Sequence, residues 1–332
     1  MLFIAEIGQA HDGSLGILHS YIDAVASTGV TAVKFQTHIA EAESSSKEPF
    51  RVNFSYEDAT RYDYWERMEF SKEQWLGIKE HCHKVQLQFI SSPFSIAAVN
   101  LLEEVGVDAY KIGSGEVSNH LLLHKIAYTG KPVILSSGMS SFEELDSAVE
   151  IFKTAGNDLS ILQCTTAYPT PPEKLGLNVL RELKDRYPYA KIGLSEHTGE
   201  IYAGLGAVAL GAEILEFHCV FDKRMFGPDA KSSLTINQIE ELVKQVKLLD
   251  ISLNNPVDKS CSNDFNELKL IFEKTLAINK DLNAGHTISI GDLEAKKPAK
   301  QGIPASQFDL VIGKKINKNL KKWDFLKEEH LS

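Results

Sequence analysis

Along residues 1–250, short apolar runs alternate with longer segments whose apolar residues recur at helical spacing. The short runs are rich in β-branched and aromatic residues, as buried strands are. They occupy residues 2–6, 32–36, 87–92, 109–114, 133–137, 160–165, 191–197 and 213–218. Between them, apolar residues stand at i, i+3 and i+4, and several segments end in glycine, a frequent helix stop. These helical segments include residues 15–29, 95–106, 141–156, 201–212 and 235–252.

Eight strands alternating with helices predict an α/β protein folded as a (β/α)₈ barrel. The active site of such a barrel lies at the C-terminal ends of its strands. A doubly wound open sheet is the alternative arrangement of the same elements. No Gly-x-Gly-x-x-Gly motif follows the first strand, which argues against a dinucleotide-binding protein.

Two segments fall outside this alternation and suggest how the chain is divided. The connection over residues 38–72 is unusually long, and its aromatic stretch "YDYWERMEF" predicts a lid that packs down on the barrel. Residues 251–265 are polar and lose the helical period. The later part has short β runs, "TLAIN" and "LVIGKKIN", among Gly, Pro and Lys. We therefore expect a catalytic barrel, a linker and a small mostly β domain, at 1–255, 256–270 and 271–332.

Composition and charge argue against nucleic-acid-binding and membrane proteins. Apolar residues make up 43% of the 332 residues, enough for a sizeable core, and the formal net charge is −10. That charge argues against a general nucleic-acid or membrane-surface binder. No apolar run approaches the roughly 20 residues of a membrane span, and the start lacks the features of a signal peptide. With four scattered cysteines, we expect reduced thiols in a cytoplasmic protein.

Polar side chains gather where the predicted strands end. Taken alone, each is more simply a solvated loop residue or a buried core histidine, but in a barrel all of them would face one cavity. Two lysines with several hydroxyls are typical of a site for phosphate or carboxylate. His197 and His218, on adjacent strands, could hold a divalent cation with open positions, and Glu6 could act as a base or orient a ligand. Together they indicate a phosphate-bearing substrate and carbonyl chemistry.

Long motifs in this order resemble one known family. The chain is similar to the sialic acid (N-acetylneuraminate) synthases, including the bacterial legionaminic and pseudaminic acid synthases. The resemblance covers nearly the whole chain, and the tail after residue 280 looks like the antifreeze-like (SAF) domain of these enzymes. The matching motifs are "AEIGQAHDGS", "AVKFQTHIAEAE", "FISSPFS", "AYKIGSGE", "KPVILSSGMSS", "LQCTTAYPTPPE", "IGLSEHTG", "LGAVALGAEILEFH" and "FGPDAKSSL".

The resemblance implies a transferase that joins phosphoenolpyruvate to an open-chain N-acetylated hexosamine, giving a nine-carbon 2-keto acid and phosphate. The acceptor would be N-acetylmannosamine or a diacetylated 6-deoxyhexose. It also implies a divalent metal, Mn²⁺ or else Mg²⁺ or Co²⁺, and a domain-swapped homodimer whose tail domain reaches the partner's barrel. No nucleic-acid or membrane partner is implied.

The resemblance also assigns expected roles to residues. Glu6, His197 and His218 would be catalytic, and the two histidines would be the metal ligands. Phosphoenolpyruvate would be held by Lys34, Gln36, Ser92, Lys111, Ser114, Ser136, Thr166 and Ser195. The acceptor sugar would be held by Glu116, Tyr168, Asp229 and Lys297.

Four positions depart from the family pattern. Ala10 stands where many members have Asn, and Thr166 replaces an Asn beside the phosphate. Phe217 replaces a basic residue before the second metal histidine, and Lys297 replaces an Arg that commonly approaches the N-acetyl group. These changes bear on substrate identity more than on the type of reaction.

Two other functions remain as alternatives. One is a phosphoenolpyruvate-condensing enzyme for another aldehyde, such as an arabinose phosphate, which would need a second basic cluster. The other is a non-catalytic sugar-binding relative, which has no need of paired histidines with an open cation position. The acceptor sugar, the native metal and the role of the 38–72 segment stay open at this point.

Overall fold

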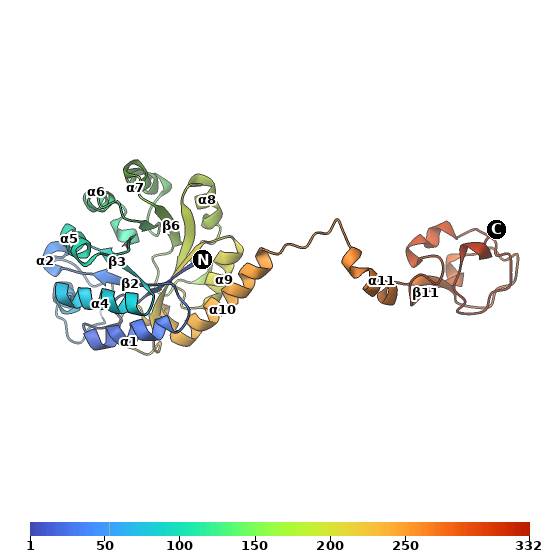
Figure 1. The fold of residues 1–332 in the computed structure, drawn as a ribbon, viewed down its shortest axis with the longest axis horizontal. Helices are drawn as coiled ribbons and strands as arrows, with labels where there is room; N and C mark the ends of the chain where they lie inside the picture. Colours follow the sequence, from blue (N-terminus) through green and yellow to red (C-terminus); the bar gives the residue numbers. More distant parts are fainter. Residues whose placement is uncertain (53) are drawn as a thin grey trace. The chain divides into compact units, whose positions relative to one another are not determined.

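The barrel is closed by parallel strand pairing. The computed structural model describes residues 1–52 and 54–332, and within them strands β1 to β8 pair in chain order while β1 also pairs with β8 (Figure 1). The predicted (β/α)₈ barrel is confirmed, and the open sheet is excluded because the β1–β8 pairing leaves no edge. The strands are β1 (Leu2–Glu6), β2 (Ala32–Thr37), β3 (Gln88–Pro93), β4 (Ala109–Ile112), β5 (Val133–Ser136), β6 (Leu159–Cys164), β7 (Lys191–Glu196) and β8 (Ile214–Val220).

Each strand is followed by a helix of the outer layer. Many of these helices begin where the sequence provides a cap; Ser141 and Glu144, for example, form a reciprocal capping box at the start of α7. The same helix ends at Gly156, whose φ of 80° suits glycine. The outer helices are α1 (Leu15–Ala26), α4 (Lys72–Lys84), α5 (Ile96–Val105), α6 (His120–Ala127), α7 (Phe142–Ala155), α8 (Val179–Arg186), α9 (Ile201–Ala209) and α10 (Ile236–Leu253).

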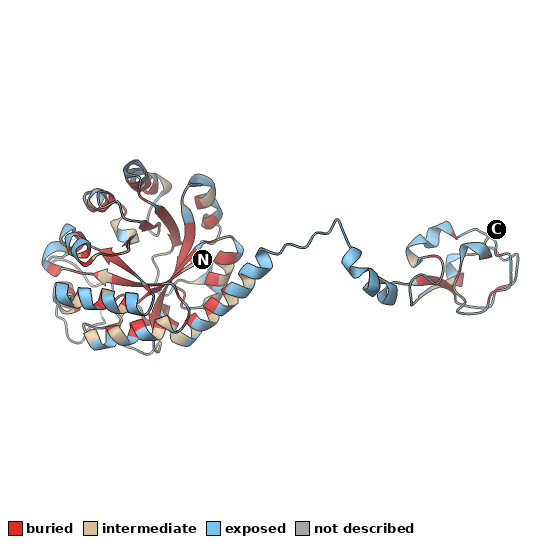
Figure 2. Ribbon diagram, viewed as in Figure 1, coloured by how far each residue is buried: buried red, intermediate tan, exposed pale blue. Residues whose placement is uncertain are grey.

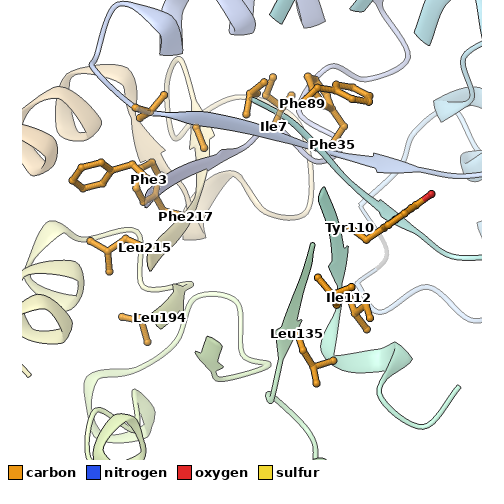
Figure 3. Packing of buried hydrophobic residues seen from close by; sticks show 14 of the residues in the cluster. Phe3, Ile7, Phe35, Phe89, Tyr110, Ile112, Leu135, Leu194, Leu215 and Phe217 are labelled. Atoms are coloured by element: carbon orange, nitrogen blue, oxygen red, sulfur yellow. The ribbon is translucent and has the colours of Figure 1, made fainter. Parts of the chain in front are cut away.

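Alternate residues of each strand face two different environments. One set packs outward against the helices; it includes Phe3, Phe35, Phe89, Tyr110 and Phe217 (Figure 3). The other set fills the barrel and begins with an apolar layer at the N-terminal ends of the strands, formed by Ile4, Ala32, Ile90, Ala109, Ile134, Leu162 and Ile214. Because side chains alternate along a strand, the residues two positions further on form the next layer inside the barrel. That layer is polar.

The long connection between β2 and α4 has structure of its own. It contains α2 (Ala40–Glu43) and α3 (Arg61–Met68), and Ala40, Tyr64, Trp65 and Met68 form a small buried apolar cluster. As the sequence predicts, the aromatic stretch packs down: Trp65 stacks on His38, just after β2, with ring centroids 3.8 Å apart. Thr60 and Asp63 form a capping box that fixes the start of α3.

Shorter elements complete the barrel unit. Strand β9 (Leu234–Thr235) pairs with β8 just before α10. Single 3₁₀ turns lie at η1 (Ser114–Glu116), η2 (Pro172–Lys174) and η3 (Ala230–Ser232).

The chain forms two compact units, Met1–Asn255 and Pro256–Ser332. The second unit has its own small core, seen as the buried segments among its mostly exposed residues (Figure 2). Part of the segment predicted as a linker is helical, since η4 and α11 begin before residue 270. The elements of this unit are η4 (Asn263–Phe265), α11 (Asn266–Phe272), β10 (Thr275–Ile278), η5 (Ile290–Asp292), β11 (Leu293–Lys296), η6 (Ala305–Leu310) and η7 (Glu328–His330).

The two β runs expected in the tail have different outcomes. "TLAIN" forms β10, which pairs antiparallel with β11. "LVIGKKIN" is not a continuous strand: it turns at Gly313, whose φ is 82°, and only Lys315 and Ile316 make isolated bridges. Among the described residues, no helix has the length and apolar character needed to cross a bilayer.

Candidate active site

Two carboxyl and two lysine side chains meet inside the barrel directly above the apolar layer. Glu6 and Lys34 are register partners on β1 and β2, and Lys34 Nζ lies 2.7 Å from Glu6 Oε2. Glu216, on β8, lies 3.6 Å from Lys34 Nζ and 3.4 Å from Lys111 Nζ on β4. All four side chains are buried. Two lysines and two carboxylates therefore form one charge-balanced cluster.

The surroundings of Glu216 favour its ionised form. Burial alone would raise the pKa of Glu216, but Lys111, Lys34 and a 2.9 Å hydrogen bond from Ser195 Oγ outweigh it, so the pKa falls below its usual range. The pKa of Lys34 is raised, because two carboxylates overcome the effect of burial. Burial dominates at Lys111 and lowers its pKa. Lys111 Nζ also donates to Ser136 Oγ at 2.7 Å.

A chain of hydrogen bonds leads from Glu6 to the wall of the cavity. Gln36 Nε2 donates to Glu6 Oε1 at 2.7 Å, and Gln36 Oε1 lies 3.2 Å from His38 Nε2. His38 Nδ1 lies 2.6 Å from Glu43 Oε1. The His38 ring is stacked between Trp65 and Phe94, with ring centroids 3.8 and 4.5 Å away. His38 is thus fixed on both faces and at both nitrogens.

The two histidines expected to bind a metal lie side by side. The ring centroids of His197 and His218 are 5.5 Å apart. Burial and the neighbouring imidazole lower the pKa of His197 to about 3, so this ring is neutral. His197 Nδ1 lies 2.9 Å from the Thr165 carbonyl oxygen, so Nδ1–H donates there and the lone pair is on Nε2. That is the form in which an imidazole coordinates a cation.

These residues surround a cavity of about 520 Å³ at the C-terminal ends of the strands. Of the fifteen residues assigned a role from the sequence, Glu6 contacts this lining through Lys34 and Gln36, and Lys297 lies in the other compact unit. The structure brings the others together in the lining, namely Lys34, Gln36, Ser92, Lys111, Ser114, Glu116, Ser136, Thr166, Tyr168, Ser195, His197, His218 and Asp229.

A second cavity, of about 740 Å³, opens at the other end of the barrel. Its floor is the apolar layer, including Ile90, Ala109 and Ile134, and Lys34, Lys111, His197 and His218 are not in its lining. Catalysis in barrels of this type occurs at the C-terminal end. We therefore assign the candidate active site to the smaller cavity.

The outer wall of the site combines aromatic and charged groups. Tyr168 stacks on His197 with a centroid separation of 4.3 Å. Arg51, from the long β2–α4 connection, also packs against Tyr168: its guanidinium carbon is 4.1 Å from the Tyr168 ring centroid. Arg51 Nη2 donates to Asp229 Oδ1 at 2.6 Å. Burial raises the pKa of the nearby Glu116.

The departures from the family pattern occupy different environments. Phe217 is fully buried among outward-facing residues, so it does not enter the cavity (Figure 3). Thr166 does line the cavity, where its hydroxyl lies 3.1 Å from Ser114 Oγ. Ala10 is half-buried and packs against the main core. Lys297 Nζ lies 4.8 Å from the ring centroid of Phe272, within its own unit.

Sequence reasoning missed several residues of this wall. Arg51, His38 and Glu43 come from an irregular connection, where no periodicity indicates which side chains face the cavity. Glu216 could have been included, because Ile214, Glu216 and His218 alternate on the inner face of β8.

Comparison with known proteins agrees with this geometry. Residues 21–281 match the NeuB family, and residues 273–332 match the SAF domain. The N,N'-diacetyllegionaminic acid synthase of Campylobacter jejuni is 32% identical over 98% of this chain and 99% of its own length. The N-acetylneuraminate-9-phosphate synthase of Homo sapiens is also 32% identical, over 98% of this chain and 91% of its own length.

A solved structure extends the likeness to three dimensions. The N-acetylneuraminic acid (sialic acid) synthetase of Leptospira borgpetersenii, in complex with citrate, superimposes with a TM-score of 0.71 at 31% identity. The match covers 80% of this chain and 89% of that one. From the barrel, the SAF domain and these matches together, the chain belongs to the NeuB family.

Proposed function

We propose that this protein is a nonulosonic acid synthase. It condenses phosphoenolpyruvate with an open-chain N-acetylated hexosamine to give a nine-carbon 2-keto acid and phosphate. The observation that carries the proposal is the placement of two buried lysines, a ring of hydroxyls and two adjacent imidazoles in one cavity. Relatives over the full length of the chain are named as synthases of such acids.

The inner part of the cavity suits phosphoenolpyruvate. Its phosphate and carboxylate need cationic and hydroxyl donors, and Lys34, Lys111 and Ser136 provide them beside Ser114 and Thr166. We assign the phosphate to the Lys111 side and the carboxylate to Lys34, Gln36 and Ser92, whose strands are neighbours. Glu6 and Glu216 balance the lysines until the substrate binds.

The residues present also fit a divalent cation. Among residues 1–52 and 54–332, no group of three or more His, Cys, Asp or Glu is placed to hold a metal ion. His197 and His218, whose ring centroids are 5.5 Å apart, would be the protein ligands, and they would leave positions for substrate or water, as a catalytic site requires. We propose Mn²⁺ for this position. When bound, the cation would polarise the aldehyde of the acceptor.

The chain's own residues would act as follows. Lys34 and Lys111 hold phosphoenolpyruvate so that its C3 faces the aldehyde carbon, and the bond between them leaves negative charge on the former aldehyde oxygen and positive charge at C2. Water then adds to C2 and gives one proton to Glu6, whose position Lys34 and Gln36 fix, and Glu6 passes this proton to the former aldehyde oxygen. The C2–O bond to phosphate then breaks, and the proton of the C2 hydroxyl leaves with the phosphate to give the keto acid and hydrogen phosphate. Glu6→Gln should reduce kcat at least about 100-fold; near-normal kcat with cation present would rule out this role.

Charge pairing at the outer wall favours a neutral acceptor. Arg51 is paired with Asp229, and Arg61 lies 3.4 Å from Glu48. Glu43 and Glu116 add negative charge to the same lining. A phosphorylated sugar would need unpaired cations here. Sequence identity does not decide this point, since one of two equally similar relatives is named for a phosphorylated product.

We also propose a homodimer in which the SAF domain of one protomer serves the barrel of the other. Large apolar side chains are exposed on α10 at Leu248 and Ile251 and on α11 at Ile271 and Phe272. A second chain would cover such surfaces. Light scattering coupled to size exclusion should give twice the 36.8 kDa chain mass; the chain mass alone would contradict the dimer.

The test of function is phosphate release from phosphoenolpyruvate. We would assay N-acetylmannosamine, its 6-phosphate and diacetylated 6-deoxyhexoses, with Mn²⁺ and with EDTA. Release that requires one neutral sugar and stops with EDTA is the expected result. Release only with the 6-phosphate would contradict the neutral acceptor, and no release with any sugar would contradict the synthase.

A further inference from the structure

Arg51 holds a position that no motif in the sequence indicates. It follows α2 on the long β2–α4 connection, yet its side chain reaches the cavity lined by the barrel strands. There it makes two contacts with residues far away in sequence, namely the 2.6 Å hydrogen bond to Asp229 and the stacking over Tyr168. Its side chain is 39% exposed, so it can also contact a bound molecule.

These contacts connect Arg51 to the reacting end of the cavity. Tyr168 lies between Arg51 and His197, 4.1 Å from the guanidinium carbon and 4.3 Å from the imidazole centroid. An arginine over an aromatic ring gains cation–π attraction and is held in place. A sugar whose aldehyde lies at His197 would therefore extend along Tyr168 towards Arg51.

Aromatic packing fixes the two segments that carry this pair. Phe54 packs against Phe226, with ring centroids 5.5 Å apart, and against Tyr64 at 5.1 Å. Phe54 follows Arg51 in sequence, and Phe226 precedes Asp229. The segment around Arg51 and Phe54 therefore contacts the segment around Phe226 and Asp229 in two ways, through the aromatic rings and through the Arg51–Asp229 hydrogen bond. This preorganisation lowers the cost of ordering Arg51 when a ligand binds.

Arg51 also keeps donors for a ligand. A guanidinium carries several N–H groups, and only Nη2 makes a hydrogen bond to another described residue. Because Asp229 already balances its charge, these donors suit a neutral oxygen better than a phosphate. An acetamido carbonyl is such an oxygen.

We propose that Arg51 is a specificity-determining residue that donates to the acetamido carbonyl of the acceptor sugar. This inference rests on the proposed synthase function, and it adds a sugar-binding residue from the β2–α4 connection. Asp229 and Tyr168 orient the guanidinium group of Arg51, and its remaining N–H groups donate hydrogen bonds to the carbonyl oxygen of the N-acetyl group.

The experiment compares two acceptors in two variants. Steady-state phosphate release would be measured with N-acetylmannosamine and with mannose, which lacks the acetamido group, for the wild type, Arg51→Ala and Arg51→Lys. In Arg51→Ala we expect KM for N-acetylmannosamine to rise about tenfold or more while KM for phosphoenolpyruvate stays within about twofold. The preference for N-acetylmannosamine over mannose, as a ratio of kcat/KM, should fall about tenfold. Arg51→Lys should behave similarly, because an ammonium lacks the planar fork.

Arg67→Ala is the matched control. Arg67 anchors the same connection through Asp58 and Asp12, at 2.8 and 2.6 Å, and it is not in the cavity lining. It should lower the melting temperature and leave the acceptor preference unchanged. The proposal is overturned if Arg51→Ala keeps the wild-type preference, or if Arg67→Ala reproduces its effect. A wild type that releases no phosphate with N-acetylmannosamine, its 6-phosphate or any diacetylated 6-deoxyhexose would contradict the synthase function itself, whereas an active wild type with an unchanged Arg51→Ala contradicts only this inference.

Discussion

A carboxylate and a histidine lie near the C-terminal ends of both β7 and β8, but the two carboxylates lie in different environments. On β8, Glu216 and His218 are two residues apart, and both line the cavity. Glu196 is the last residue of β7 and His197 follows it directly, so the two side chains point to opposite faces. Glu196 is buried outside the cavity, where its Oε2 accepts hydrogen bonds from the Thr198 N–H and hydroxyl at 2.8 and 2.6 Å. A carboxylate two residues from the histidine, as in Glu216, therefore faces the cavity with it. A carboxylate one residue from the histidine, as in Glu196, faces away from the cavity and has a structural role.

The electrostatics of the two carboxylates differ in the same way. Burial raises the pKa of Glu196 to about 7 despite its hydrogen bonds. For Glu216, two lysines reverse the effect of burial and lower the pKa. Equal burial therefore leads to opposite shifts, and the difference lies in the charged partners.

The largest expected effect concerns the histidine that shares the inner face with Glu216. His218→Ala removes one of the two proposed cation ligands and should reduce kcat/KM about 1,000-fold or more. Mn²⁺ bound per chain, measured on the folded variant by elemental analysis after dialysis, should fall with it. Unchanged Mn²⁺ binding would show that His218 is not a ligand.

Glu216→Gln should have the next largest effect. The substitution leaves Lys34 and Lys111 buried with only Glu6 to balance them, which should cost about 3 kcal/mol of the free energy of unfolding. We expect kcat/KM to fall on the order of 100-fold, since the lysines repel each other. Urea denaturation and phosphate release measure the two effects. Wild-type stability would mean that the lysines are not both charged.

A third carboxylate–histidine pair gives an intermediate case. Glu43 holds His38 from a connection rather than a strand. Glu43→Gln keeps a hydrogen-bond partner for His38 but removes the charge, so we expect a loss in kcat/KM of about tenfold. The expected change in melting temperature is small because Trp65 and Phe94 still hold the ring. Activity equal to wild type would show that the pair has no part in aligning Gln36.

Glu196→Gln should have the smallest effect and serves as the control for Glu216→Gln. The glutamine carbonyl can still accept both hydrogen bonds from Thr198, so we expect a change of about 1 kcal/mol or less in stability and near-normal kcat. The same assays apply. An effect as large as that of Glu216→Gln would show that Glu196 also takes part in activity, although it does not face the cavity.

The alternation of apolar runs with helical segments explains how much of the fold could be predicted from the sequence. Short apolar runs between segments of helical spacing predicted β1 to β8, and the polar residues that end these runs predicted the lining of the site. Such a pattern does not tell which inner residues pair. The link from Lys34 to both Glu6 and Glu216 depends on barrel closure, which brings β8 next to β1. In the tail, "LVIGKKIN" has a strand-like composition, but Gly313 turns the chain there.

Irregular segments were the least predictable part of the site. The aromatic residues of "YDYWERMEF" indicated packing, and Tyr64, Trp65 and Met68 are buried. Nothing in that pattern indicates Arg51 or His38, because their positions depend on Asp229, Tyr168 and Phe94, which come from other parts of the chain.

The separate apolar cluster of the β2–α4 connection has a consequence for evolution. Ala40, Tyr64, Trp65 and Met68 pack with one another and not within the main core of the barrel. The connection can therefore vary in sequence at this cluster without disturbing the main core of the barrel. A replacement connection would have to keep the contacts of Glu43 and Trp65 with His38, because these contacts lead through Gln36 to Glu6 in the charged layer.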